Sequence, residues 1–567
     1  MKNGIRGTAL MAVIVALFTS NSANANEGFR IVPSPRKMEQ GDRVAMPLGA
    51  PVRSNRASVA ELFVADMDAV GHDIQQVSLG LSVRHPVWVW GGEEAVSLLR
   101  QLRPPEQKHG YTLLIGSEGA AVAAGDLNGL RYGVQSVLQL VEQSADGSWP
   151  AMSIRDWPHF GFRAFHSRLR PPKHFGAVGM DETIGIYKWM IRRLARYKYT
   201  HLCLMLKGDM VFKSRPELQT GPWTASDIQR LLQFAAARGI TVFPEVKTLG
   251  KFFHGMPQAQ LEAFSPLLEP KTYIGQLDYQ ARYHDGYRRK AEELEQEQKA
   301  LEKERKSTAK ISGDFKVRNP QVFTFLRPVL DEVYDAFGQP DYYHIGCDES
   351  FYTAIQASPE DRGKYMADYI NRVARHLQAK GATLMMWDDM LVNHEQFPWF
   401  FEAHGGPPLN TWRAVDHLDR DLVLACWHYG WTVAGHRPED YPMVPWLAEH
   451  GFEVIGVPWF NIQGMIDLAR VVDEAGGSGM MGTSFGFAGA IQGARGKPLR
   501  EAARRKVASR KELSVLAATA EVSWAPHSAA EALDRYDPES WEKRWLPFQP
   551  GEGPGPESTD REAPTSD

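Results

Sequence analysis

The sequence contains little cysteine, and this scarcity excludes two classes of protein. Only three of its 567 residues are cysteines: Cys203, Cys347 and Cys426. Three thiols are too few for a disulfide framework, and their spacing does not resemble that of zinc ligands. Each stands in an apolar, strand-like run, so we predict buried thiols and no metal centre.

An excess of charge of one sign is also missing. The formal net charge is -4, which gives no electrostatic reason to expect nucleic acid or an anionic membrane as a partner. No glycine-rich phosphate loop follows any predicted strand, which argues against a nucleotide-binding fold. The composition, with 43% hydrophobic and 23% charged residues, is that of an ordinary globular protein.

Long apolar runs are missing too, and the run nearest the start of the chain is short and follows basic residues. Lys2 and Arg6 precede the apolar run 8–18, and Ala23-Asn24-Ala25 is a small-residue cleavage site. This arrangement predicts a signal peptide over residues 1–25, with cleavage after Ala25. The run is too short to span a bilayer, and no later segment predicts a span. We therefore expect a periplasmic or secreted protein.

Two folded units are predicted after the signal peptide. Residues 27–156 predict a small, non-catalytic α/β domain. Residues 157–546 alternate strands with helices, which is typical of a parallel (β/α)8 TIM-type barrel. A helix is predicted after the N-cap-like Thr224, and another over 359–379. The eight predicted strands are Phe162–Ser167, Thr200–Leu206, Ile240–Val246, Tyr342–Gly346, Thr383–Trp387, Leu422–Trp427, Glu453–Pro458 and Met480–Phe485.

Two segments do not fit this alternation. Residues 288–310 are dense in Glu, Lys, Arg and Gln, which predicts a charged helical insertion on the surface. A lid over the site and an oligomer contact are the alternatives for it. Residues 547–567 are rich in Gly, Pro, Glu and Ser, which predicts a disordered tail.

The strongest chemical signal is the pair Asp348-Glu349, directly after the predicted strand 342–346. Acidic side chains are costly to bury at the end of an apolar strand, and catalytic groups are expected at the carboxyl ends of barrel strands. Other strand ends contribute carboxylates, aromatic residues and a few cations. Because indole faces stack on sugar rings and carboxylates bind hydroxyls, this mixture indicates a sugar site.

The adjacency of the two carboxylates favours one mechanism. Glycoside cleavage normally uses two carboxyl groups on opposite sides of the scissile bond, which neighbours in a chain do not easily provide. We therefore predict that the substrate supplies the nucleophile, through the oxygen of a 2-acetamido group. One carboxylate then orients the acetamide, and the other protonates the leaving oxygen. This chemistry requires no cofactor.

The segment His344-Ile345-Gly346-Cys347-Asp348-Glu349 resembles the His-x-Gly-Gly-Asp-Glu motif of glycoside hydrolase family 20, the β-N-acetylhexosaminidases. Residues 156–163, 243–246, 319–333 and 386–389 are similar to further segments of that family. The leading domain is similar to the family's non-catalytic α/β domain. The resemblance covers roughly residues 31–526.

The resemblance implies roles for particular residues. Asp348 would orient the acetamide, and Glu349 would be the general acid and base. Arg163 would hold sugar hydroxyls and Trp387 would wall the acetamide pocket, with His344 as a supporting hydrogen-bond partner. The remaining candidates for substrate binding are Glu245, Asp389, Trp427 and Trp459. The implied partner is a glycan that contains an amino sugar.

The sequence also departs from the family pattern. Cys347 stands where the motif has its second Gly. Lys247 and Lys251 stand where the family has Asp and His. Trp459-Phe460-Asn461 replaces a Tyr-x-Asp that contacts the substrate, and Phe485 stands where a Trp is expected. These differences leave the catalytic pair intact and leave GlcNAc or GalNAc, and exo or endo cleavage, open.

Three functions remain in view. The first is an exported, retaining glycosidase that removes terminal β-linked N-acetylhexosamine with substrate assistance. The second is a barrel that binds glycans without turning them over, as the lost contacts suggest. The third is a glycosidase with an enzyme nucleophile, which would pair Glu349 with Glu245 or Asp389.

Overall fold

A computed structural model describes residues 29–534, apart from longer gaps at 251–261, 269–309, 430–440 and 485–514 and several gaps of one to five residues. The predicted signal peptide, the predicted disordered tail, Phe485 and nearly all of the predicted charged insertion lie outside the described residues. None of the described helices is both long and apolar enough to cross a bilayer.

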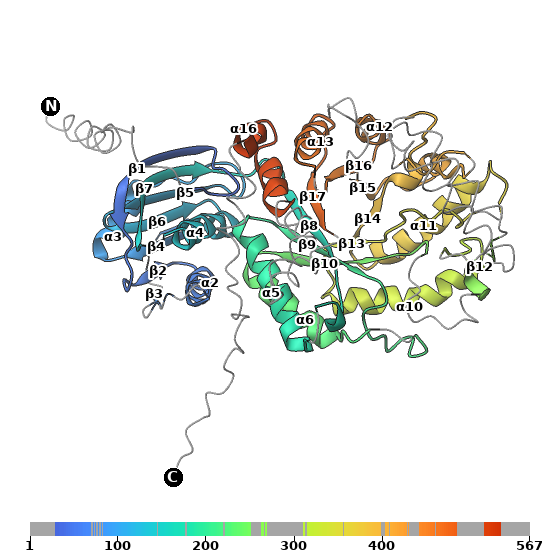
Figure 1. The fold of residues 1–567 in the computed structure, drawn as a ribbon, viewed down its shortest axis with the longest axis horizontal. Coiled ribbons are helices and arrows are strands. Elements are labelled where there is room, and N and C mark those ends of the chain that lie inside the picture. The colour runs from blue at the N-terminus through green and yellow to red at the C-terminus, as the bar shows by residue number, and fades with distance from the viewer. Residues whose placement is uncertain are drawn as a thin grey trace, which may run out of the picture.

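The leading domain is a seven-stranded sheet with two principal helices (Figure 1). The strand order is β1-β7-β5-β6-β4-β2-β3, and all pairs are antiparallel except β2 with β3. Helix α4 packs its apolar face on this sheet and begins at Asp126, whose side chain accepts a hydrogen bond from the Gly129 amide. The elements are β1 (Lys37–Ala45), β2 (Val52–Ser54), α2 (Ala57–Asp68), β3 (Val77–Ser78), β4 (Val87–Gly91), α3 (Glu93–Ser97), η1 (Leu98–Arg100), β5 (Tyr111–Gly116), β6 (Gly119–Ala124), α4 (Leu127–Glu142) and β7 (Ser148–Asp156).

The second unit is a closed barrel of eight parallel strands, which confirms the predicted fold class. Its strands are continuous hydrophobic runs because they are buried on both faces. All eight were predicted within one or two residues, and the strand before the catalytic pair ends early, at His344. The strands are β8 (Phe162–Arg168), β9 (His201–Leu206), β10 (Thr241–Val246), β13 (Tyr342–His344), β14 (Thr383–Trp387), β15 (Leu422–Trp427), β16 (Glu453–Val457) and β17 (Gly479–Ser484).

Helices surround this barrel (Figure 1). Thr224 and Asp227 form a capping box at the start of α6, as the sequence indicated. The helices and short elements are η2 (Pro172–Phe175), α5 (Met180–Arg196), α6 (Ala225–Ala237), α10 (Pro320–Ala336), α11 (Arg362–Gln378), η4 (Asp389–Leu391), η5 (Thr411–Asp416), α12 (Met443–Glu449), α13 (Ile462–Glu474) and α16 (Ala529–Asp534), and β11 (Leu267–Leu268) pairs with β12 (Lys310–Ile311).

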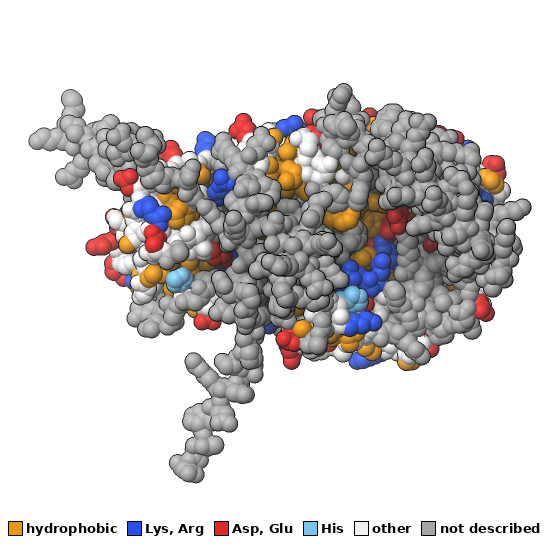
Figure 2. All heavy atoms as spheres, in the orientation of Figure 1, with side chains coloured by type: hydrophobic (Ala, Val, Ile, Leu, Met, Phe, Trp, Pro, Cys, Tyr) orange, Lys and Arg blue, Asp and Glu red, His pale blue; other side chains and the backbone are white. Residues whose placement is uncertain are grey.

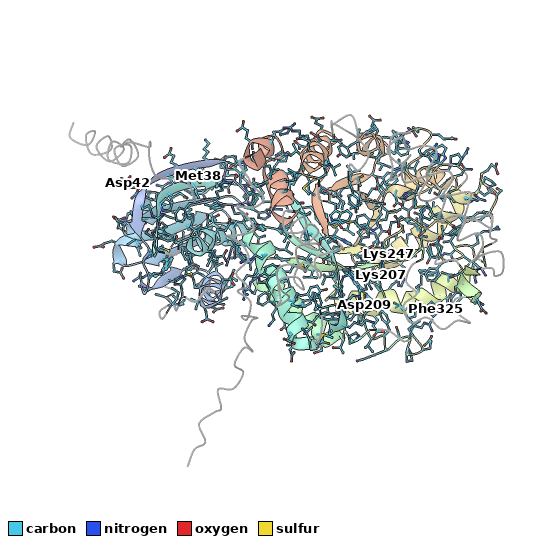
Figure 3. All side chains as sticks on the ribbon, viewed as in Figure 1. Met38, Asp42, Lys207, Asp209, Lys247 and Phe325 are labelled. Carbon is cyan, nitrogen blue, oxygen red and sulfur yellow. The ribbon has the colours of Figure 1, made fainter. Side chains whose placement is uncertain are left out.

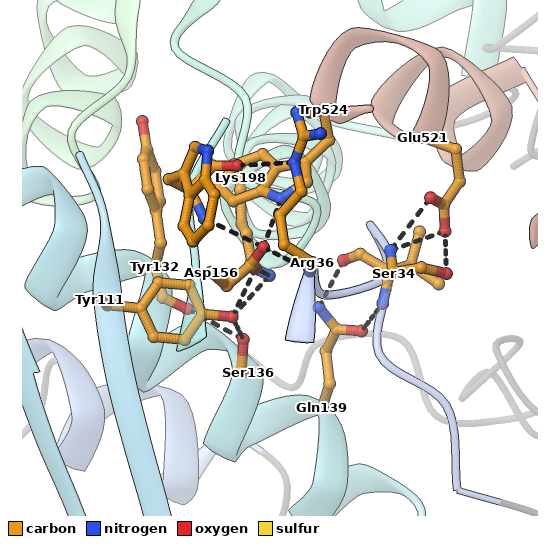
Figure 4. A network of polar contacts seen from close by, with 12 residues as sticks. Ser34, Arg36, Tyr111, Tyr132, Ser136, Gln139, Asp156, Lys198, Glu521 and Trp524 are labelled. Atoms are coloured by element: carbon orange, nitrogen blue, oxygen red, sulfur yellow. Dashed lines mark hydrogen bonds and ion pairs between the residues drawn. The ribbon is translucent and has the colours of Figure 1, made fainter. Parts of the chain in front are cut away.

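A buried polar network joins the two units (Figure 4). Asp156, at the end of β7, is fully buried and accepts hydrogen bonds from the Tyr111 hydroxyl at 2.9 Å and the Trp524 indole at 2.8 Å. Lys198, from the turn before β9, lies 3.4 Å from the same carboxylate. These contacts tie the leading sheet, the barrel and the helical segment 515–524 into one interface.

Candidate active site

The predicted catalytic pair, Asp348 and Glu349, lies in a sharply turned loop at the carboxyl end of β13. Gly346 has φ +72°, and two residues that are not glycine also have positive φ: Cys347 at +82° and Glu349 at +43°. Side chains other than glycine pay about 1 kcal/mol or more for this conformation, and such residues cluster at functional sites. The φ of Cys347 explains why glycine suits this position in the motif. Asp348 and Glu349 are both partly exposed.

Below this loop, Glu245 is a fully buried carboxylate at the end of β10. Its Oε2 lies 2.5 Å from His166 Nε2, and its Oε1 accepts from Trp387 Nε1 at 3.0 Å and lies 2.9 Å from Lys247 Nζ. Burial alone would raise the pKa of Glu245, but Lys247 and His166 hold it well below its usual range. The buried carboxylate is thus ionised and compensated by the protein itself.

Lys247 connects this buried carboxylate to the catalytic pair. Its ammonium contacts the Oδ1 atom of Asp348 as well as Glu245, and Figure 3 labels it at the end of β10. Burial would lower the pKa of Lys247, but Asp348 and Glu245 raise it well above its usual value. Around the labelled position, Figure 2 shows Lys and Arg side chains gathered beside hydrophobic and acidic ones.

Asp389 holds the backbone of Glu349. Its Oδ2 accepts from the Glu349 amide at 2.8 Å and lies 2.9 Å from His404 Nδ1, and its Oδ1 accepts from Trp427 Nε1 at 3.1 Å. Burial raises the pKa of Asp389, although His404 opposes the shift. Because both oxygens are engaged by the protein, the geometry favours a positioning role over direct contact with a sugar.

Aromatic side chains follow three neighbouring strands. The Trp387 ring is buried and packs on His344, with ring centroids 4.5 Å apart. The ring centroids of Trp427 and Tyr429 are 5.1 Å apart, and those of Tyr429 and Trp459 are 5.2 Å apart. These three rings form a continuous row at the ends of β15 and β16. The structure thus brings two of the predicted aromatic residues, Trp427 and Trp459, together on either side of the buried ring of Tyr429.

Arg163 lies apart from this cluster. Its buried guanidinium donates to the carbonyl oxygens of Lys198 at 3.0 Å and Phe160 at 2.7 Å and to the Tyr132 hydroxyl at 2.7 Å. It stands at the amino end of β8, about 16 Å of strand before Arg168 at the carboxyl end. This corrects the expected placement of Arg163 beside the sugar, because its side chain instead holds the interface with the leading domain.

Several residues of the cluster were not singled out from the sequence as site residues. His166 and Lys247 belong to the polar residues near the carboxyl ends of the predicted strands, and alternation along the strand could have paired Lys247 with Glu245 on the inner face. His404 comes from a loop with no local signal. Asn461, which stands where the family has Asp, caps α13 by accepting from the Gly464 amide at 3.0 Å.

One group in the described part of the chain has three possible ligand atoms within 4.8 Å of one another: His166, Cys203 and Glu245. Burial raises the pKa of the Cys203 thiol well above its ordinary value, which disfavours the thiolate that binds metals. Glu245 already accepts from three donors. These side chains are therefore poorly suited to hold a cation.

His344 is neutral and its tautomer is fixed. Burial lowers the pKa of His344 to about 3, and its Nδ1 atom accepts from the Gly346 amide at 3.0 Å. The proton of the neutral ring must then sit on Nε2, which has no hydrogen-bond partner among the described residues. His344 supports the turn before the catalytic pair, as the resemblance implied.

This low pKa predicts acid sensitivity. A histidine whose pKa falls from 6.5 in the unfolded chain to about 3 in the folded protein stabilises the fold above pH 6.5 and loses that contribution as the pH falls. The slope is ~1.4 kcal/mol per pH unit. In His344→Asn, an amide oxygen can replace Nδ1 as acceptor, so urea unfolding should show a shallower decline between about pH 6.5 and 4.5. Equal slopes for both proteins would contradict this assignment.

Comparison with known proteins places the chain in a family. The sequence model of the catalytic domain of glycosyl hydrolase family 20 matches residues 194–433, and that of the family's domain 2 matches residues 28–157. The chain belongs to glycosyl hydrolase family 20. This confirms the family that the motif at 344–349 suggested, and low identities to other members show that it is a divergent one.

Among curated family 20 relatives, a beta-hexosaminidase of Porphyromonas gingivalis is 25% identical over 325 residues, covering 51% of this chain and 36% of the relative. A lacto-N-biosidase of Bifidobacterium bifidum is 24% identical, covering 58% of this chain and 25% of the relative. The chain thus spans well under half the length of these two relatives.

Solved structures share the fold. An exo beta-N-acetylglucosaminidase from Vibrio harveyi matches with a TM-score of 0.57 and 15% identity, covering 92% of this chain and 77% of that one. A Streptomyces plicatus beta-hexosaminidase matches with a TM-score of 0.56 and 17% identity, covering 91% and 93%.

Proposed function

We propose that this family 20 protein is an exported, retaining glycosidase that removes terminal β-linked N-acetylhexosamine from a glycan. Its mechanism is substrate-assisted. The acetamide oxygen of the sugar attacks the anomeric carbon while the bond to the leaving oxygen breaks, and Glu349 gives that oxygen a proton. Asp348 faces the acetamide N–H of the resulting cationic ring. Glu349 then takes a proton from water, which attacks the anomeric carbon as the bond to the acetamide oxygen breaks, and the original configuration is restored.

One observation carries the choice of mechanism. The other two carboxylates that were candidates for an enzyme nucleophile, Glu245 and Asp389, are fully buried, and both oxygens of each are engaged by protein donors. A nucleophile must reach the anomeric carbon. The partly exposed carboxylates Asp348 and Glu349 are adjacent in the chain and do not easily flank one bond. The acetamido group of the substrate is therefore a better candidate for the nucleophile than any of these carboxylates.

The contact between Lys247 and Asp348 favours a second candidate, a barrel that binds glycans without cleaving them. An ammonium on the orienting carboxylate reduces the charge that stabilises a cationic intermediate, unless another anion compensates. The buried carboxylate of Glu245 supplies such an anion, so turnover remains the first proposal.

Turnover of matched aryl glycosides by the purified protein tests these proposals. Aryl β-N-acetylglucosaminide and β-N-acetylgalactosaminide should be cleaved, and aryl β-glucoside, which lacks the internal nucleophile, should not. Cleavage of the glucoside at a similar rate would contradict substrate assistance and favour an enzyme nucleophile. Binding of N-acetylhexosamine without cleavage of any substrate would favour the glycan-binding barrel.

Export is tested separately. Expression of the full chain in a Gram-negative host should give a product shortened after Ala25 in the periplasm or medium. An unprocessed protein that stays in the cytoplasm would contradict export without affecting the proposed chemistry.

A further inference from the structure

Lys247 is built into the barrel between a buried carboxylate and a catalytic one. It follows Glu245 by two residues, so both side chains are on the inner face of the barrel. Its side chain is only 7% exposed, and its Nζ lies 2.9 Å from Glu245 Oε1 while contacting Asp348 Oδ1. A Cβ on Gly346 would come within 2.9 Å of Lys247 Cδ, so glycine at 346 leaves room for the lysine stem.

A series of side-chain contacts that holds Lys247 in place extends across the barrel. Thr483, on β17, lies 3.0 Å from His166 Nδ1, and His166 Nε2 lies 2.5 Å from Glu245 Oε2. Glu245 then contacts Lys247, which contacts Asp348. This continuous series of contacts links four strands and ends on one oxygen of the catalytic carboxylate, so the orientation of Asp348 depends on the far wall of the barrel.

The charges of Glu245, Lys247 and Asp348 together amount to a single negative charge. Glu245 and Asp348 contribute two negative charges and Lys247 one positive charge, so the trio presents a net charge of about -1 beside the substrate. A single orienting carboxylate would present the same charge. The buried Glu245 therefore restores the negative charge that the lysine removes, and stabilisation of a cationic intermediate is retained.

We propose that Lys247 is a positioning residue for the reaction: it fixes Asp348 and keeps it ionised, so that it accepts the acetamide N–H under acidic conditions. This inference rests on the proposed function. A cation in contact with a carboxylate favours its charged form, typically by one to three pH units.

The other titratable groups around Lys247 do not provide this charge. His344, on β13, is neutral because burial lowers its pKa to about 3. Burial raises the pKa of Cys347 beyond the working range and also raises the pKa of Asp389. His166, on β8, is bonded to Glu245. The ammonium of Lys247, in contact with Asp348 Oδ1, supplies a positive charge there.

The pH profile of kcat/KM for the aryl acetamido substrate tests this role. In Lys247→Met, the acidic limb should move upward by at least about one pH unit, so that kcat/KM measured on the acidic limb of the wild type falls about tenfold or more while kcat/KM near pH 7 falls less. Lys247→Arg keeps a cation and should keep the position of the acidic limb. A uniform loss of activity with an unmoved acidic limb would overturn the proposal and leave Lys247 a structural role.

A second variant keeps the test informative if Lys247→Met does not fold. Lys247→Met leaves Glu245 buried without its counter-charge, whereas the double variant Glu245→Gln with Lys247→Met removes both buried charges. Its acidic limb should also move upward, but by less, because Asp348 has lost both the ammonium in contact with it and the more distant negative charge of Glu245. An unmoved limb in this variant overturns the proposal too. If the wild type shows no turnover, the proposed function itself fails; if it turns over and neither limb moves, only the role of Lys247 fails.

Discussion

Replacing Glu349 with Gln is expected to lower kcat by about 10²- to 10⁴-fold, the usual contribution of a general acid and base. Gln keeps the size of the side chain but has no proton to give to the leaving oxygen. The hydrogen bond from Glu349 to Asp389 is donated by the backbone amide, so the loop geometry should survive the change of side chain. The loss should be larger for a disaccharide than for an aryl glycoside, because an aryl leaving group needs less protonation.

Steady-state kinetics on both substrates measures this effect. Glu395→Gln, an exposed glutamate outside the cluster, is a matched control and should keep wild-type rates. KM should change little in Glu349→Gln, which separates loss of the acid from loss of binding. If the variant retained more than a tenth of the wild-type kcat on the disaccharide, Glu349 would not be the acid.

Replacing Asp66 with Asn is expected to destabilise the protein by about 3 kcal/mol or more without altering the catalytic cluster. Asp66, on α2 of the leading domain, is fully buried, and three arginines of the barrel surround it. Arg238 lies 2.6 Å from its carboxylate, and Arg192 and Arg196 each lie 3.2 Å away. Burial would raise the pKa of Asp66, but the arginines lower it, so the carboxylate is charged.

The physical reason is an uncompensated charge. Asn cannot balance the arginines, of which Arg196 and Arg238 remain buried at the junction of α2, α5 and α6. Urea unfolding should show a lower midpoint for Asp66→Asn, while Asp68→Asn, an exposed neighbour on the same helix, should match the wild type. An unchanged midpoint for Asp66→Asn would show that the interface does not limit the stability of the protein.

The features that local sequence encodes were predicted well. Strand and helix positions follow from runs of apolar residues and capping residues, which are short-range patterns. Thr224 marks the start of α6, and the eight apolar runs became the eight barrel strands. The family was identified from the motif at 344–349, because the two adjacent carboxylates after a buried strand are an unusual local pattern.

The contacts of the site were harder to predict because they join strands that are distant in the chain. Arg163 shows the limit most clearly. Its position in a strand was predicted, but its direction toward the leading domain depends on the packing of two folded units. Asp389 and Glu245 were taken as sugar ligands, and the structure shows that protein donors engage both of them.

The sequence by itself determined the two-unit architecture, the family and the position of Asp348 and Glu349 at a strand end, because each depends on residues close together in the chain. Only the tertiary structure decided that Lys247 lies between Glu245 and Asp348 and that Arg163 serves the interface. Closing a sheet into a barrel fixes the register and tilt of eight strands together, and this geometry decides which inward side chains meet.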